Sequence, residues 1–311
     1  MKILVTGAVG FIGSHLCEKL NSLGFIVSGI DNFSEYYSVE LKNKNKLNLT
    51  KLGIDVITLD LANLDDLLKL NNDFDYIFHL AAQPGISNTV SFEDYLHNNF
   101  VATKNLLQFA LKNKNLKQFI NISTSSVYGL YATSDEDSAP KPASYYGVTK
   151  LAAEQLVLSY VRNNLINACS LRLYSVYGPR ERPDKMFSKL IDCAYQNIPF
   201  TLNEGSDKHL RSFTYVKDIV EGMVTLLKKE DITNGEIYNI GSDKEYTTGE
   251  CIKLVEKLSN HKIEIVNSPK RVGDQFRTIA IIEKARNVLN YNPKYNLEQG
   301  VLEQIESYLN Q

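Results

Sequence analysis

The sequence contains few cysteines, and none of them is arranged for a disulfide framework or a metal site. Four cysteines occur among 311 residues, at positions 17, 169, 193 and 251. None belongs to a C-x-x-C pair, and none has histidine neighbours at the spacing of metal ligands. We therefore predict no bound metal. Reduced thiols favour a cytoplasmic location.

The chain also lacks an excess of charge and any long apolar run. Lysine and arginine number 34 against 36 acidic residues, which gives a net charge of -2, and no basic block stands out. We therefore expect neither a nucleic-acid partner nor a membrane partner. No stretch reaches the length of a transmembrane helix, and residues 1–5 already read as a strand, which leaves no room for a signal peptide.

The first half of the chain alternates short apolar runs with longer amphipathic segments. Continuous apolar strands between helices predict a parallel sheet covered on both faces, and right-handed crossovers then make it a doubly wound α/β Rossmann sheet. The predicted strands are 3–5, 26–30, 56–59, 76–80, 119–122 and 168–173, and the predicted helices are 11–23, 92–112 and 145–162.

After Leu173 the segments become shorter and turn residues cluster, which indicates a smaller mixed α/β lobe at the C-terminal side. We predict a Rossmann domain over 1–173 that also takes in 213–240. The remaining segments, 174–212 and 241–311, would form a lobe that binds the substrate.

The first predicted strand leads into a glycine-rich turn with Gly7, Gly10 and Gly13 at G-x-x-G-x-x-G spacing. Such a turn lets a pyrophosphate approach the N-terminus of the following helix, here at Phe11 and Ile12. Asp31 and Asn32 end the second strand, where an acidic side chain binds the adenosine ribose. Because Asp31 would repel a 2′-phosphate, the pattern predicts NAD rather than NADP.

Two further segments follow strands at the carboxyl edge of the sheet, where ligands bind in this fold. They are Asp60–Leu61 and the stretch Leu80-Ala81-Ala82. The small side chains of Ala81 and Ala82 would let the backbone pass close to a cofactor. Taken alone, each segment could instead consist of ordinary packing residues that do not contact a cofactor.

A hydroxyl cluster and a tyrosine–lysine pair carry the predicted chemistry. Tyr146 and Lys150 are four residues apart and share one helix face, so the ammonium would favour the phenolate and create a base for a sugar hydroxyl. Thr124 could share that proton. Tyr145 is the rival base, but only Tyr146 precedes Lys150 by four residues.

These motifs together resemble the NAD-dependent epimerase/dehydratase family of extended short-chain dehydrogenases/reductases, from residue 1 to about residue 305. The resemblance implies a nicotinamide pocket at Asn99, Tyr146, Lys150 and Tyr174, and a homodimer formed through helices 92–112 and 145–162. It is carried by the T-G-x-x-G-F-I-G-S-H start and by the segments 79–82, 123–129, 146–150, 177–180, 211–216, 238–241 and 273–274.

The hydroxyl cluster also bears on the reaction. Dehydratases and decarboxylases of this family carry carboxylates near the catalytic threonine, whereas this chain has Ser125 and Ser126 there. We therefore expect a nucleotide-sugar 4-epimerase, which oxidises the sugar transiently to a 4-keto form and reduces it again on the other face. Gln83 and Ser175 complete the predicted sugar pocket.

Residues 178–187 resemble the branch of the family that acts on UDP-glucuronate and UDP-galacturonate, in which an arginine at the Arg182 position helps to receive the sugar carboxylate. That branch has an arginine where Ser87 stands, so UDP-glucose, UDP-galactose and UDP-N-acetylhexosamines remain alternatives. Another epimerase or reductase on the same site, or a cofactor-sensing regulator, are further alternatives. The resemblance places Arg211 on the diphosphate and Asp274 on a ribose hydroxyl.

Overall fold

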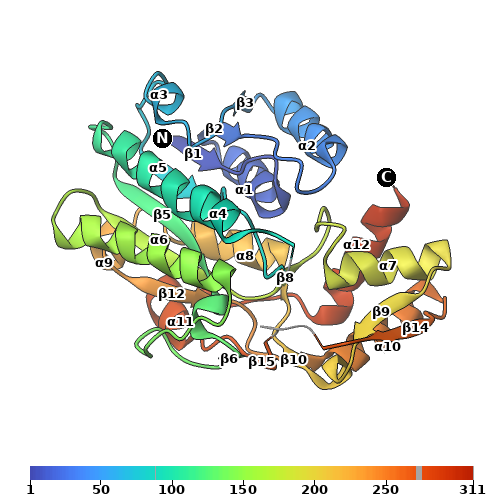
Figure 1. The fold of residues 1–311 in the computed structure, drawn as a ribbon. Coiled ribbons are helices and arrows are strands. Elements are labelled where there is room, and N and C mark those ends of the chain that lie inside the picture. Colours follow the sequence, from blue (N-terminus) through green and yellow to red (C-terminus); the bar gives the residue numbers. More distant parts are fainter. Residues whose placement is uncertain (88, 271–274, 311) are drawn as a thin grey trace.

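The computed structural model describes residues 1–87, 89–270 and 275–310, and its centre is a seven-stranded sheet in the order β12-β7-β5-β4-β1-β2-β3 (Figure 1). Every neighbouring pair in this sheet is parallel. The strands are β1 (Lys2–Thr6), β2 (Ile26–Asp31), β3 (Asp55–Thr58), β4 (Tyr76–His79), β5 (Gln118–Thr124), β7 (Ala168–Leu173) and β12 (Ile237–Ile240). The predicted fold class, a parallel Rossmann sheet, is confirmed.

Helices cover both faces of the sheet. Successive side chains of a strand point to opposite faces, so apolar side chains on both faces need to be covered. Ile3 and Val5 of β1 belong to the core cluster that contains α1 and α8, whereas Leu4 belongs to the cluster that contains α5. The helices around the sheet are α1 (Phe11–Ser22), α2 (Val39–Lys51), α3 (Leu64–Leu67), α4 (Phe92–Tyr95), α5 (Ala102–Leu111), α6 (Tyr145–Arg162), α8 (Val216–Val224), α9 (Glu230–Thr233) and α11 (Glu283–Leu289). In Figure 1, α5 and α6 lie side by side on one face.

The helix predicted over 92–112 is interrupted. The structure divides it into α4, a π-helix at Leu96–Val101 and α5. Apolar periodicity indicated one continuous helix here and did not resolve the π-turn between α4 and α5. Such turns often occur at functional sites. Here the turn contains Asn99, which is buried and faces the loop after β4.

The C-terminal segments build a smaller lobe beside the carboxyl edge of the sheet (Figure 1). Its main helices are α7 (Met186–Gln196), α10 (Thr248–Ser259) and α12 (Leu297–Leu309). Short strands complete it, namely β6 (Tyr131–Ala132), β8 (Val176–Tyr177), β9 (Phe200–Asn203), β10 (Leu210–Arg211), β11 (Thr214–Tyr215), β13 (Tyr246–Thr247), β14 (Ile265–Ser268) and β15 (Arg277–Thr278). Capping boxes begin both α10 and α12. The division into two domains stays a prediction.

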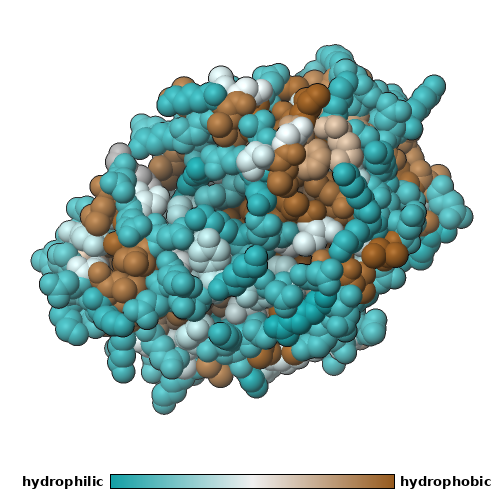
Figure 2. Space-filling model, turned by 180° about the vertical axis from the view of Figure 1, so that it is seen from behind, coloured by the Kyte–Doolittle hydropathy of each residue, from teal (hydrophilic) through white to brown (hydrophobic). Residues whose placement is uncertain are grey.

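The surface is mainly hydrophilic when viewed from behind, and its apolar residues lie in separate groups (Figure 2). Among the described residues, none of the helices has the length and apolar character that crossing a membrane requires.

Candidate active site

A cavity of about 560 Å³ runs along the carboxyl edge of the sheet and continues into the smaller lobe. It brings together most of the residues that the sequence singled out. Those lining it are Gly7, Gly10, Phe11, Ile12, Gly13, Asp31, Asn32, Asp60, Leu61, Leu80, Ala81, Ala82, Gln83, Thr124, Ser125, Ser126, Tyr146, Lys150, Tyr174, Ser175, Arg182 and Arg211.

The glycine-rich turn is packed so closely that side chains could not replace its hydrogens. Gly7 has a φ of +69°, which favours glycine, and a Cβ there would lie 2.9 Å from the backbone nitrogen of Ala81. A Cβ on Gly13 would lie 2.1 Å from the carbonyl oxygen of Gly7. The turn therefore brings the N-terminus of α1 against the ends of β1 and β4, as a site for a pyrophosphate requires.

We expect Gly13→Ala to destabilise the fold by about 1–3 kcal/mol and to weaken dinucleotide binding, because the new methyl group must displace backbone atoms. Urea unfolding and titration with NAD measure the two effects. Gly249→Ala is the matched control, since a Cβ in this first turn of α10 would meet its nearest atom at 3.4 Å. Equal stability of the two variants would contradict the packing argument.

At one end of the cavity Asp31 accepts hydrogen bonds from the backbone nitrogens of Phe33, at 2.9 Å, and Val9, at 3.3 Å. Burial raises the pKa of this carboxyl group, while these hydrogen bonds and the charge of Lys42 oppose the rise. Lys42 is also buried, and burial lowers the pKa of its ammonium group. The Asp31 carboxylate can accept hydrogen bonds from the hydroxyl groups of a ribose, and the Lys42 ammonium can donate to them.

The hydroxyl cluster and the tyrosine meet as predicted. Thr124 ends β5 and Tyr146 lies in the first turn of α6, and both side chains line the cavity, where the Thr124 hydroxyl opposes the rise in the pKa of the Tyr146 phenol. Tyr95 supports this corner, because its hydroxyl donates to the carbonyl oxygen of Gly85 at 2.6 Å and its ring lies 6.1 Å from that of Tyr146.

The electrostatics of Tyr146 differ from the prediction. Burial raises the pKa of its phenol, and the groups that oppose the rise are Thr124, the Arg182 guanidinium and the backbone at Gly85, rather than Lys150. Burial lowers the pKa of the Lys150 ammonium to about 8, which the charge of Glu154 opposes. Sequence spacing placed the two groups on one helix face but could not show that the charge of Arg182 acts on the phenol.

Several buried polar atoms of the cavity wall have no hydrogen-bond partner among the described residues. They include the Ser123 hydroxyl, the Tyr174 hydroxyl and the Gln83 amide nitrogen. Burying such groups unpaired costs about 1–3 kcal/mol each. Together with the glycine turn and the buried Lys150, they fit a dinucleotide with ribose hydroxyl and carboxamide groups.

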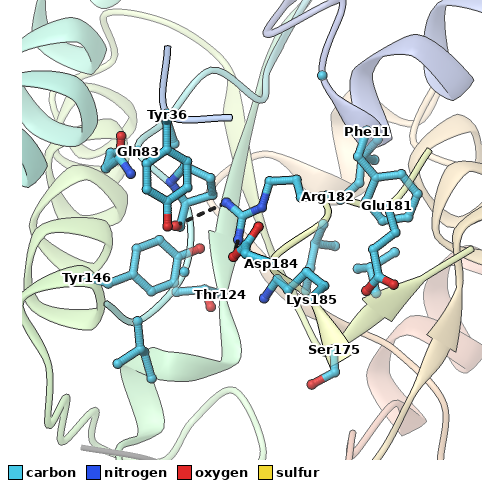
Figure 3. Close-up of a pocket in the computed structure, with 18 of the residues that line it drawn as sticks. Phe11, Tyr36, Gln83, Thr124, Tyr146, Ser175, Glu181, Arg182, Asp184 and Lys185 are labelled. Atoms are coloured by element: carbon cyan, nitrogen blue, oxygen red, sulfur yellow. Dashed lines mark hydrogen bonds and ion pairs between the residues drawn. The ribbon is translucent and has the colours of Figure 1, made fainter. Parts of the chain in front are cut away.

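Arg182 lies across the cavity rather than on the surface, since only 6% of it is exposed. Its guanidinium donates to the carbonyl oxygen of Pro84 at 3.2 Å and to Asp184 at 3.1 Å, and it lies 5.2 Å from the centre of the Tyr36 ring. Figure 3 shows it between Tyr146 and Tyr36 on one side and Glu181 on the other.

Glu181 is a carboxyl group in the cavity wall that the sequence did not indicate. It accepts hydrogen bonds from Gln304 at 2.9 Å and from the Ser188 hydroxyl at 3.3 Å. Burial raises its pKa to about 7, against the opposing influence of Gln304, Lys185 and Ser188.

The native state therefore holds a proton that the unfolded chain releases, so Glu181 makes the protein less stable as pH rises from about 4.5 to about 7. We expect Glu181→Gln to remove this slope and to raise stability at pH 8 by about 3 kcal/mol. Urea unfolding from pH 5 to pH 8 measures it, with the exposed Glu204→Gln as control. Parallel curves for wild type and Glu181→Gln would rule out the raised pKa.

Two predicted residues in the described part of the chain, Asn99 and Ser87, do not line the cavity. Asn99 lies behind the wall, where it accepts from the Gln83 backbone at 2.7 Å and donates to the Thr149 hydroxyl at 3.1 Å. Ser87 is hydrogen-bonded with Thr89 at 2.9 Å instead. Asp274 lies outside the described residues. Their proposed ligand contacts stay predictions.

Other lining residues were missed by the sequence reasoning. Tyr36 and Tyr37 follow Asp31 on the loop into α2, Lys42 lies in the first turns of α2, and Lys185 follows Arg182. Glu181 and Lys185 could have been suggested by their closeness to Arg182 in the sequence. No sequence motif marks Tyr36, Tyr37 or Lys42.

The fold and the site define a Rossmann-fold protein of the short-chain dehydrogenase/reductase type, with its hydroxyl, tyrosine and lysine groups in one cavity. Residues 3–241 match the model of the NAD dependent epimerase/dehydratase family, and the chain belongs to this family. The resemblance found in the sequence is thereby confirmed.

Named relatives are similar over nearly the whole chain. A crystal structure of UDP-glucuronic acid 4-epimerase from Bacillus cereus, in complex with UDP-glucuronic acid and NAD, has a TM-score of 0.94 and 38% identity, and the match covers 100% of this chain and 99% of that one. UDP-glucuronate 4-epimerase 1 of Arabidopsis thaliana is 33% identical over 99% of this chain and 77% of the relative. YtcB of Bacillus subtilis, named an uncharacterized UDP-glucose epimerase, is 38% identical over 98% and 97%.

Proposed function

We propose that the protein is an NAD-dependent 4-epimerase that interconverts UDP-glucuronate and UDP-galacturonate. The observation that carries the proposal is the meeting of Thr124, Tyr146, Lys150 and Arg182 in the cavity that the glycine turn opens. The similarity to the Bacillus cereus enzyme, over both entire chains, supports the same substrate pair.

Residues of this chain would hold the dinucleotide from one end to the other. The glycine turn would face the pyrophosphate, Asp31 and Lys42 the adenosine ribose, and Lys150 with Tyr174 the nicotinamide end. The bound dinucleotide supplies reversible two-electron oxidation at a sugar carbon.

Tyr146 acts as the base that takes the proton of the C4 hydroxyl group and returns it, because its phenol lies in the cavity against Thr124. Thr124, which lines the same cavity, shares this proton with Tyr146. The nearby Arg182 charge favours the phenolate. Arg182 also provides a planar donor for the sugar carboxylate. Arg211, which lines the same cavity, binds the diphosphate.

A UDP-glucose/UDP-galactose 4-epimerase is the second candidate. Ser87 is neutral and does not line the cavity, so this position supplies no charge to a uronate, and YtcB is named a UDP-glucose epimerase. Incubation of the purified protein with UDP-glucuronate, followed by anion-exchange analysis, separates the candidates. Formation of UDP-galacturonate without UDP-xylose supports the UDP-glucuronate 4-epimerase. Conversion of UDP-glucose but not of UDP-glucuronate favours the UDP-glucose 4-epimerase.

The proposal includes a homodimer in the cytoplasm. The π-helix and α6 expose Leu96 by 38%, Tyr145 by 60% and Val148 by 44%, which suits an interface between two copies of α4–α5 and α6. All four cysteines are unpaired and buried, which suits a reducing compartment. Sedimentation analysis tests the dimer.

A further inference from the structure

The sugar end of the cavity contains a second cation besides Arg182. Lys185 follows it by one turn, with its backbone nitrogen donating to the carbonyl oxygen of Arg182 at 3.0 Å. Its side chain lines the same cavity as Thr124, Tyr146 and Ser175. Lys185 therefore belongs to the wall of the proposed sugar site.

The guanidinium of Arg182 already has several contacts in this wall. One terminal nitrogen donates to the carbonyl oxygen of Pro84, the other is paired with Asp184, and the plane lies over the Tyr36 ring. A sugar carboxylate next to it would be a second anion beside Asp184. One arginine cannot balance both charges, so the geometry calls for another cation within reach.

Lys185 is placed to be that cation. Its ammonium nitrogen lies 3.8 Å from the position that a Cβ on Gly85 would occupy. The carbonyl oxygen of Gly85 accepts from Tyr95, whose ring lies 6.1 Å from that of Tyr146, and Lys185 and Tyr146 line the same cavity, so the ammonium lies on the reacting side. In Figure 3 the amine of Lys185 is directed into the cavity, below Arg182 and on the side of Thr124.

We propose that Lys185 is a specificity-determining residue that binds the carboxylate of the hexuronate together with Arg182, an inference that rests on the proposed function. Arg182 and Lys185 belong to the same turn of the chain, and they would contact the carboxylate in different ways. Arg182 is fixed by its three contacts and offers an oriented edge, whereas Lys185 is a point charge on a flexible stem. The pair discriminates uronates from neutral hexoses without any arginine at position 87.

The test compares the affinity of the NAD-loaded enzyme for UDP-glucuronate with its affinity for UDP-glucose by calorimetry. Because a hydrogen bond between two charged groups is lost, we expect Lys185→Gln to weaken binding of UDP-glucuronate by about tenfold or more and to leave UDP-glucose within about twofold. Lys185→Arg keeps the charge and should retain most of the preference. Lys208→Gln is the control, because Lys208 is exposed and does not line the cavity.

Equal losses for the two ligands, or no loss for either, would overturn the role of Lys185. A wild-type protein that binds UDP-glucose as tightly as UDP-glucuronate would overturn it as well. Failure of the proposed function has a different signature, namely absence of UDP-galacturonate from wild-type incubations even though UDP-glucuronate is bound and the Lys185→Gln variant binds it less well.

Discussion

Tyr146→Phe is expected to lower the rate of sugar inversion by about 10²- to 10⁴-fold, with the fold and dinucleotide binding preserved. The substitution removes only the hydroxyl group that shares the cavity with Thr124, and the ring keeps its packing against Tyr95. Turnover of UDP-glucuronate, circular dichroism and NAD titration measure the three properties.

Tyr145→Phe is the matched control, because it removes the same atom from the neighbouring residue. Tyr145 is 60% exposed and its ring packs against Phe92, at 5.3 Å, rather than facing the cavity. We expect this variant to keep wild-type turnover. If Tyr145→Phe were the inactive variant and Tyr146→Phe the active one, the assignment of the base would be wrong.

Glu154→Gln is expected to destabilise the protein by about 3–5 kcal/mol, because it leaves a buried arginine without its counter-charge. Glu154 of α6 and Arg172 of β7 form an ion pair at 2.7 Å, and their side chains are 0% and 1% exposed. The same guanidinium donates to the Tyr128 hydroxyl at 2.8 Å, and Tyr128 in turn donates to Asn239 of β12. Denaturation in urea measures the loss.

Two controls separate the effect of burying the charges from the effect of removing one partner of the ion pair. The pair between Lys257 and Glu298 is exposed, so Glu298→Gln should cost less than about 1 kcal/mol. Replacing both buried partners, as in Glu154→Leu with Arg172→Met, should recover most of the stability because no unpaired charge remains. A double variant that is less stable than Glu154→Gln would contradict this account.

The sheet and the dinucleotide turn could be predicted because their physical signals are local. Buried parallel strands read as continuous apolar runs, and the turn at Gly7–Gly13 needs glycine for its close backbone contacts. The helix α2 was missed because its segment is rich in lysine and asparagine and has little apolar periodicity.

The parts of the site that could not be predicted depend on contacts between distant segments. Arg182 lies near Tyr146 only because the loop after β8 crosses the loop after β4. Asn99 is turned behind the wall by a π-helix that leaves no clear pattern in the sequence. The same limitation applies to Lys42, which is buried because α2 packs near the end of β2.

The position of β12 has a consequence for synthesis on the ribosome. This strand comes from residues 237–240, yet it pairs with β7 at one edge of the sheet, and its Asn239 contacts the network around Arg172. A nascent chain that has emerged only as far as Leu173 exposes β7 as an unpaired edge, a species prone to aggregate. The completed sheet forms only after the intervening segment has been translated, so folding of the nucleotide-binding half must wait for part of the other lobe.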